Sequence, residues 1–104
     1  MGTIRMQVQR DQYQGMESIK ITGPFDALDP IVEEYLKQIL EEGKTSVAFD
    51  LSQTSYLTSP GIGILIKAIK WFHSVSGTVY ICGATKDIKE FLSLSRIDSY
   101  LKFI

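Results

Sequence analysis

Hydrophobic and polar positions alternate in two stretches near the start of the chain. Residues 6–8 and residues 18–22 each place apolar side chains two positions apart, with polar side chains between them. This alternation is typical of β-strands that bury one face. The polar segment from Asp11 to Gly15 separates the two stretches. The pattern therefore predicts a β-hairpin that ends at Gly23-Pro24.

A helical pattern comes next. Asp29 is a suitable N-cap, and Pro30 is suited to the first helical position because its missing N–H would have no partner there. Apolar residues then recur at helical spacing, and they are Ile31, Val32, Tyr35, Leu36, Ile39 and Leu40. Gly43 ends this pattern, which predicts an amphipathic helix over about residues 30–42.

The middle of the chain predicts two strands that flank a helix. Val47 to Leu51 is a nearly continuous apolar run, as expected of a central strand, and Ser52 to Leu57 is predicted to be a connecting loop. Thr78 to Cys82 is a second short apolar run. Between them, Ser59 is predicted to be the N-cap of a helix over about residues 60–74. Strand, helix and strand in this order form a βαβ unit.

The last part of the chain predicts a third helix and a closing turn. The helix is expected over residues 86–94, with Ile88, Phe91 and Leu92 facing inward. Apolar residues after it, ending at Phe103, predict a final turn and a last strand.

Length and composition limit the function classes. The 104 residues are enough for one domain, residues 1–104, and the net charge of −1 attracts neither nucleic acid nor an anionic membrane. No apolar stretch reaches the roughly 18 residues of a membrane span, so no membrane insertion is expected. The single Cys82 and an N-terminus without the apolar core of a signal peptide favour a cytoplasmic location. The sequence does not indicate an oligomeric state.

Ser59 raises the question of nucleophilic catalysis. The only histidine, His73, lies on the same predicted helix, about 20 Å away at 1.5 Å per residue. A nucleophile elbow also requires a glycine two residues before the serine, where this chain has Leu57. Ser59 is therefore either a helix cap or a site of another kind, and we expect no enzymatic activity.

Cofactor and metal sites are not expected either. Gly61-Ile62-Gly63 lies inside the predicted helix and lacks the Gly-Lys-Ser/Thr sequence of a phosphate-binding loop. These two glycines are expected to allow close packing. One histidine and one cysteine do not supply the ligands of a structural metal site, and Cys82 is expected to be a small core residue.

Four segments of the chain, taken in order, resemble the STAS domain of the anti-sigma-factor antagonist type. They are Gly23-Pro24-Phe25-Asp26, Val47-Ala48-Phe49-Asp50-Leu51-Ser52, Tyr56-Leu57-Thr58-Ser59-Pro60-Gly61-Ile62-Gly63-Ile64-Leu65, and Gly77-Thr78-Val79-Tyr80-Ile81-Cys82. The resemblance covers nearly the whole chain. It implies an α/β fold with a four- or five-stranded mixed sheet and helices packed mainly on one face.

The resemblance also implies a function. In that family, the first serine of an Asp-Ser-Ser/Thr-Gly segment is phosphorylated by a partner kinase that is also the anti-sigma factor, and this phosphoacceptor falls on Ser59. The implied partner surface comprises Pro24, Asp26, Thr58, Pro60, Gly61 and Ile62. Two positions depart from the family pattern, since Thr58 replaces the aspartate and Pro60 replaces the second hydroxyl residue.

Two functions from different classes remain open at the level of sequence. The first is a phosphorylation-switched module that binds a serine-kinase anti-sigma factor when Ser59 is unmodified. The alternative is an accessory subunit that docks constitutively on the ATPase of an ABC transporter through the same helix surface.

Overall fold

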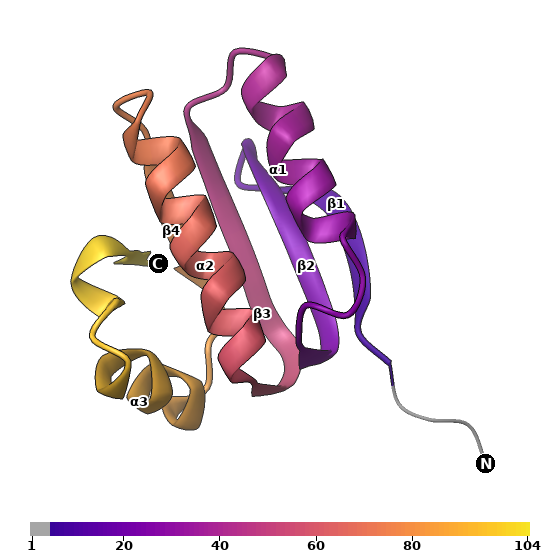
Figure 1. Cartoon of the computed structure of the whole chain (residues 1–104), viewed down its shortest axis with the longest axis vertical. Helices are drawn as coiled ribbons and strands as arrows, with labels where there is room; N and C mark the ends of the chain where they lie inside the picture. The colour runs from indigo at the N-terminus through magenta and orange to yellow at the C-terminus, as the bar shows by residue number, and fades with distance from the viewer. Residues whose placement is uncertain (1–4) are drawn as a thin grey trace.

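The computed structural model describes residues 5–104, which form a five-stranded sheet with helices along one face (Figure 1). The strands are β1 (Gln7–Tyr13), β2 (Met16–Phe25), β3 (Ser46–Leu57), β4 (Thr78–Cys82) and β5 (Lys102–Phe103), and the helices are α1 (Ile31–Glu41), α2 (Ser59–His73) and α3 (Lys86–Leu94). The order in the sheet is β1-β2-β3-β4-β5. β1 is antiparallel to β2, and the other neighbouring strands are parallel.

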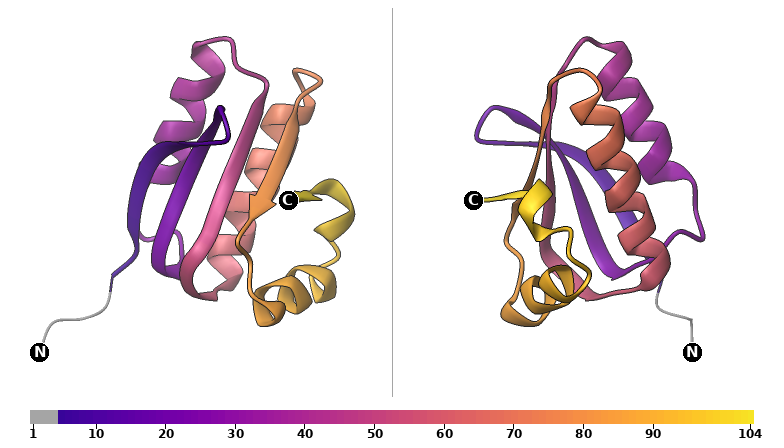
Figure 2. Two further views of the ribbon diagram at one scale, coloured as in Figure 1. Left: turned by 180° about the vertical axis from the view of Figure 1, so that it is seen from behind. Right: turned by 60° about the vertical axis from the view of Figure 1, so that its left-hand side comes forward.

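Helices α1 and α2 pack side by side on one face of the sheet, and no helix of residues 5–104 covers the opposite face (Figure 2). The predicted mixed sheet with helices mainly on one face is thereby confirmed, with β3 as the central strand. The core lies between the two layers and includes the fully buried Phe25, Phe49 and Phe72. Within the described residues, no helix combines the length and apolar character that crossing a membrane requires.

The hairpin has a tighter turn than the sequence suggested. Gln14 and Gly15 join β1 to β2, and both have positive φ, 50° and 80°. Two successive positive φ angles are the signature of a type I′ turn, whose twist matches that of the flanking strands. The prediction of a polar turn over Asp11 to Gly15 was therefore wrong in extent, because β1 continues to Tyr13.

β3 is also longer than predicted. The segment Ser52–Leu57, which was expected to be a loop, continues the strand and pairs in parallel with the end of β2. The register shifts twice along this pair, so burial recurs at Leu51, Thr54 and Leu57 rather than at every second residue. Because the alternation is broken, the sequence pattern does not indicate a strand here. β2 likewise continues through Gly23-Pro24 to Phe25.

The predicted helices and the C-terminal turn agree with the structure to within about one residue at each end. α1 begins at Ile31 rather than Pro30, and the Asp29 carboxylate accepts a hydrogen bond from the Ile31 amide at 3.0 Å. α3 has its predicted bounds. The closing turn is the 3₁₀ helix η1 (Asp98–Tyr100), which leads into β5.

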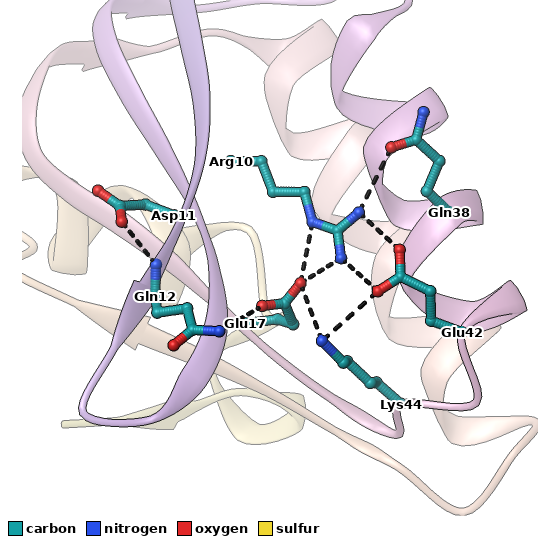
Figure 3. Close-up of polar contacts among 7 residues, drawn as sticks. All are labelled: Arg10, Asp11, Gln12, Glu17, Gln38, Glu42 and Lys44. Carbon is teal, nitrogen blue, oxygen red and sulfur yellow. Dashed lines mark hydrogen bonds and ion pairs between the residues drawn. The ribbon is translucent and has the colours of Figure 1, made fainter.

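A network of charged side chains joins the hairpin to the end of α1 (Figure 3). Arg10 of β1 donates hydrogen bonds to both Glu42 oxygens, at 2.9 and 2.7 Å, and also binds Glu17. Lys44 lies 3.3 Å from Glu17 and 3.5 Å from Glu42. The Glu17 side chain is only 7% exposed, and its hydrogen bond from Arg10 lowers its pKa although burial opposes the shift.

This network predicts a pH-dependent contribution to stability. Because the pKa of folded Glu17 lies below its ordinary value, the contribution is complete above that ordinary value and is lost as the pH falls through the folded pKa. We expect Glu17→Gln to lower the free energy of unfolding at pH 7 by about 1 kcal/mol. The difference from the wild type should shrink as the pH falls below the ordinary pKa of a glutamate and through the folded pKa of Glu17.

Urea denaturation at several pH values between 7 and 3 measures this effect. Glu90→Gln is a matched control, because Glu90 is exposed on α3 and forms no ion pair within residues 5–104. A loss in Glu17→Gln that stays constant across this pH range would show that the amide disrupts packing instead.

Candidate functional site

The N-terminus of α2 is capped by Thr58. The Thr58 backbone is extended, with φ −105° and ψ 165°, and its Oγ1 accepts a hydrogen bond from the Gly61 amide at 3.1 Å. Ser59 is therefore the first helical residue and Pro60 the second. The prediction that Ser59 is the cap was wrong by one position. Since Thr58 performs the capping, the exposed Ser59 hydroxyl is not needed to begin the helix.

The start of α2 is fixed to the end of β2 through the Phe25 carbonyl oxygen. This oxygen accepts hydrogen bonds from the Thr58 amide at 3.1 Å and from Thr58 Oγ1 at 2.8 Å. Gly61 lies against the same carbonyl, because a Cβ added to Gly61 would lie 2.3 Å from the Phe25 oxygen. The expectation that glycine allows close packing is confirmed at Gly61. It was wrong at Gly63, which has nothing within 4 Å of an added Cβ.

The loop from β2 to α1 lies at the same end of the sheet as the start of α2 (Figure 1). Asp26 opens this loop, directly after Phe25, and its carboxylate accepts a hydrogen bond from the Leu28 amide at 3.1 Å. At the other end of the loop, the Asp29 carboxylate accepts a hydrogen bond from the Ile31 amide. These two hydrogen bonds hold the loop at both ends. Between them, the side chain of Leu28 is 91% exposed.

The structure brings the predicted site residues together at this end of the sheet, but it exposes only some of them. Ser59 and Pro60 are exposed, and Asp26 and Thr58 are partly exposed. The other predicted contact residues are buried and support the site from beneath, and they are Pro24, Gly61 and Ile62. Leu28 is a further exposed side chain at this end of the sheet, and its only signal in the sequence is an apolar residue between two aspartates.

Other reactive side chains lie elsewhere. His73 is at the far end of α2 from Ser59, and its ring packs against Tyr100 with centroids 6.4 Å apart. Cys82 is buried, and burial together with the charge of Asp50 raises the pKa of its thiol to about 11. Cys82 is therefore a small core residue, as predicted. Residues 5–104 contain no cluster of side chains that could hold a metal ion.

The position of the cap gives a direct prediction. Thr58→Ala should lower the free energy of unfolding by about 1 kcal/mol or somewhat more, because it removes both the cap and the bond to Phe25. Ser59→Ala should change the free energy of unfolding by less than about 0.5 kcal/mol, because alanine is well tolerated at an exposed helical position. Denaturant titrations of both variants measure the difference. Equal losses would show that the two hydroxyls share the capping.

Comparison with known proteins identifies the fold and the family. A family model described as the STAS domain matches residues 7–104. An anti-sigma-B factor antagonist of Staphylococcus epidermidis is 24% identical to this chain over 86 residues, which are 82% of this chain and 80% of that protein.

Two solved structures superimpose well on the chain. An anti-sigma factor antagonist from Mycobacterium paratuberculosis has a TM-score of 0.79 and 16% identity, over 95% of this chain and 85% of its own. The anti-sigma factor antagonist SpoIIAA in its unphosphorylated form has a TM-score of 0.71 and 14% identity, over 96% of this chain and 87% of its own. These likenesses confirm the predicted fold, and the family match confirms the resemblance seen in the sequence.

Proposed function

The chain belongs to the STAS domain family, and we propose that it is an anti-sigma-factor antagonist that binds a serine-kinase anti-sigma factor while Ser59 is unphosphorylated. Phosphorylation of Ser59 releases the partner. The observation that carries this proposal is the exposed serine at the first position of α2, beside the loop that begins at Asp26. The names of the similar proteins support the same function.

The two departures from the family pattern are compatible with this role. Thr58 stands where the family has aspartate. Its hydroxyl accepts a hydrogen bond from the Gly61 amide, as the carboxylate of an aspartate cap does. Pro60 lies in the first helical turn, where its missing N–H costs no helical hydrogen bond. The start of α2 therefore keeps its form, and Ser59 stays exposed.

A phosphate on Ser59 would be weakly neutralised by the chain itself. The first turn of a helix normally offers free amides to an anion. Here Pro60 has no amide hydrogen, and the Gly61 amide is already bound to Thr58. The loop at the same end of the sheet carries two further carboxylates, those of Asp26 and Asp29. A charge of about −1.5 to −2 would therefore remain exposed, and it would oppose a partner that buries this surface.

In this proposal the chain is a binding module rather than an enzyme. A serine nucleophile needs a base within hydrogen-bonding distance, and the only histidine lies at the other end of α2. This end of the sheet instead offers an exposed hydroxyl, the exposed Pro60 and the exposed apolar side chain of Leu28, which suit a protein contact.

The decisive experiment uses the purified chain as bait in a lysate of its native cells. The expected partner is a serine-kinase anti-sigma factor, which should phosphorylate Ser59 when the purified pair is incubated with ATP, as read by mass spectrometry. Ser59→Ala should bind the kinase but stay unmodified. Capture of an ABC transporter ATPase, with no phosphate on Ser59, would support the accessory-subunit alternative and overturn the proposal.

Leu28 should be an apolar anchor of this contact. Leu28→Ala is expected to weaken binding of the purified kinase about tenfold, because Leu28 is 91% exposed on the loop at the same end of the sheet as Ser59, and a large exposed apolar side chain gains from burial in a partner. Leu94→Ala is the matched control, since Leu94 is 84% exposed but lies at the end of α3. Calorimetric titration compares them. Equal affinity of the two variants would place Leu28 outside the interface.

A further inference from the structure

An apolar groove of about 400 Å³ lies between the second half of α2 and the C-terminal segment. Its lining residues on α2 are Ile66, Ile69, Lys70 and His73, whose spacing places them on one stripe of the helix. Ile97 and Tyr100 line the opposite side. Figure 1 shows the C-terminal segment running beside α2. The groove is thus made by two parts of the chain and lies apart from Ser59.

The surface inside the groove is almost entirely carbon, and none of the residues that line it within the described range, 5–104, is an aspartate or a glutamate. Ile69 and Ile97 are each 7% exposed, so they form the floor. Lys70 is exposed at the rim and forms no ion pair within residues 5–104, whereas Lys67, one turn earlier, is paired with Glu33 at 2.8 Å. A ligand that matches this groove has an apolar body and one negative charge.

We propose that the groove binds a medium-chain aliphatic carboxylate, with the alkyl chain over Ile66, Ile69 and Ile97 and the carboxylate at Lys70. The volume is near the lower end of small-molecule pockets, which range over about 300–1,000 Å³. The lining stripe on α2, from Ile66 to His73, is about 10 Å long. A partner helix of about 12 residues would be about 18 Å long and would extend well beyond it. A single alkyl chain fits the groove better.

Amide NMR spectra of the whole chain test the proposal, with octanoate, decanoate and dodecanoate as probes below their micelle concentrations. Chemical-shift changes are expected at the groove residues and not at Ser59. Affinity should rise about two- to fourfold per added methylene until the alkyl chain fills the stripe of about 10 Å, because only buried methylenes contribute to binding. Decylammonium, which has the same chain length and the opposite charge, should bind more weakly than decanoate.

Two lysine variants separate the charge from the groove. Lys70→Met should weaken decanoate binding about three- to fivefold, the effect of one exposed ion pair, and should leave decanol binding unchanged. Lys67→Met removes the same charge outside the groove and should bind decanoate like the wild type. Both side chains are exposed, so neither change threatens folding.

Three results would each overturn the proposal. The first is the absence of shifts at groove residues up to the solubility limit of dodecanoate. The second is equal binding of decanoate and decylammonium. The third is a dimer in sedimentation that does not dissociate when decanoate is added and whose interface, located by the amide spectra, includes the groove residues.

Discussion

Gly61→Ala is expected to lower the free energy of unfolding by about 3 kcal/mol, the upper part of the range for overpacked sites. The new methyl group would lie 2.3 Å from the Phe25 carbonyl oxygen and 3.2 Å from Leu57 Cδ1. The start of α2 and the end of β2 cannot easily move apart, because Thr58 donates two hydrogen bonds to the same Phe25 carbonyl oxygen. The start of α2 would have to separate from β2 to relieve the clash.

Gly63→Ala is the matched control, two residues further along the same helix. Gly63 is exposed, and an added Cβ would have nothing within 4 Å. Alanine there should raise the free energy of unfolding by about 1 kcal/mol, the difference in helix propensity between the two residues. If α2 and β2 are as close as the structure shows, urea denaturation gives changes in the free energy of unfolding that have opposite signs for the two variants. Stabilisation of the chain by both changes would contradict that packing.

The opposite roles of the two glycines show what a periodic pattern leaves undetermined. The apolar positions of α2 identify which side of the helix faces the core, and they predicted the helix to within one residue at each end. They do not state how closely the first turn approaches another backbone. That distance depends on where β2 ends, and β2 continues past Gly23-Pro24, which the sequence pattern marked as its end.

The capping residue could not be assigned from sequence for a similar reason. Thr58 and Ser59 are both suitable caps, and Pro60 is acceptable in either of the first two helical positions. Only the extended backbone of Thr58 and its bond to Phe25 distinguish them. The choice is thus made by a tertiary contact 33 residues away along the chain.

The structure brings the segments of the predicted site residues to one end of the sheet, but it does not expose all of these residues. The resemblance placed Ser59 and Asp26 at one surface, and the structure brings their segments together through Phe25. The resemblance does not indicate which neighbouring residues are exposed, because exposure depends on packing between distant strands. Pro24 lies beside Tyr56 in the sheet and is buried, whereas Leu28 lies in a loop and is exposed.

Ser59→Asp is expected to weaken binding of the purified serine-kinase anti-sigma factor roughly thirtyfold, which corresponds to about 2 kcal/mol. The carboxylate would add charge at the end of the sheet where the loop that carries Asp26 and Asp29 also lies, and a buried contact that gains an unpaired charge loses several kcal/mol at most. The fold should be unaffected, because Thr58 rather than Ser59 caps α2 and position 59 is exposed.

Ser59→Asn is the control that separates charge from size. Asparagine has nearly the shape of aspartate without its charge, so its affinity for the kinase should stay within about threefold of the wild type if charge is the switch. Calorimetric titrations at low and high salt should show that the penalty of Ser59→Asp shrinks as salt screens the exposed charges. If Ser59→Asn binds as weakly as Ser59→Asp, the surface around Ser59 rejects any larger side chain. The release of the partner would then be steric, and the charge of a phosphate would not be its cause.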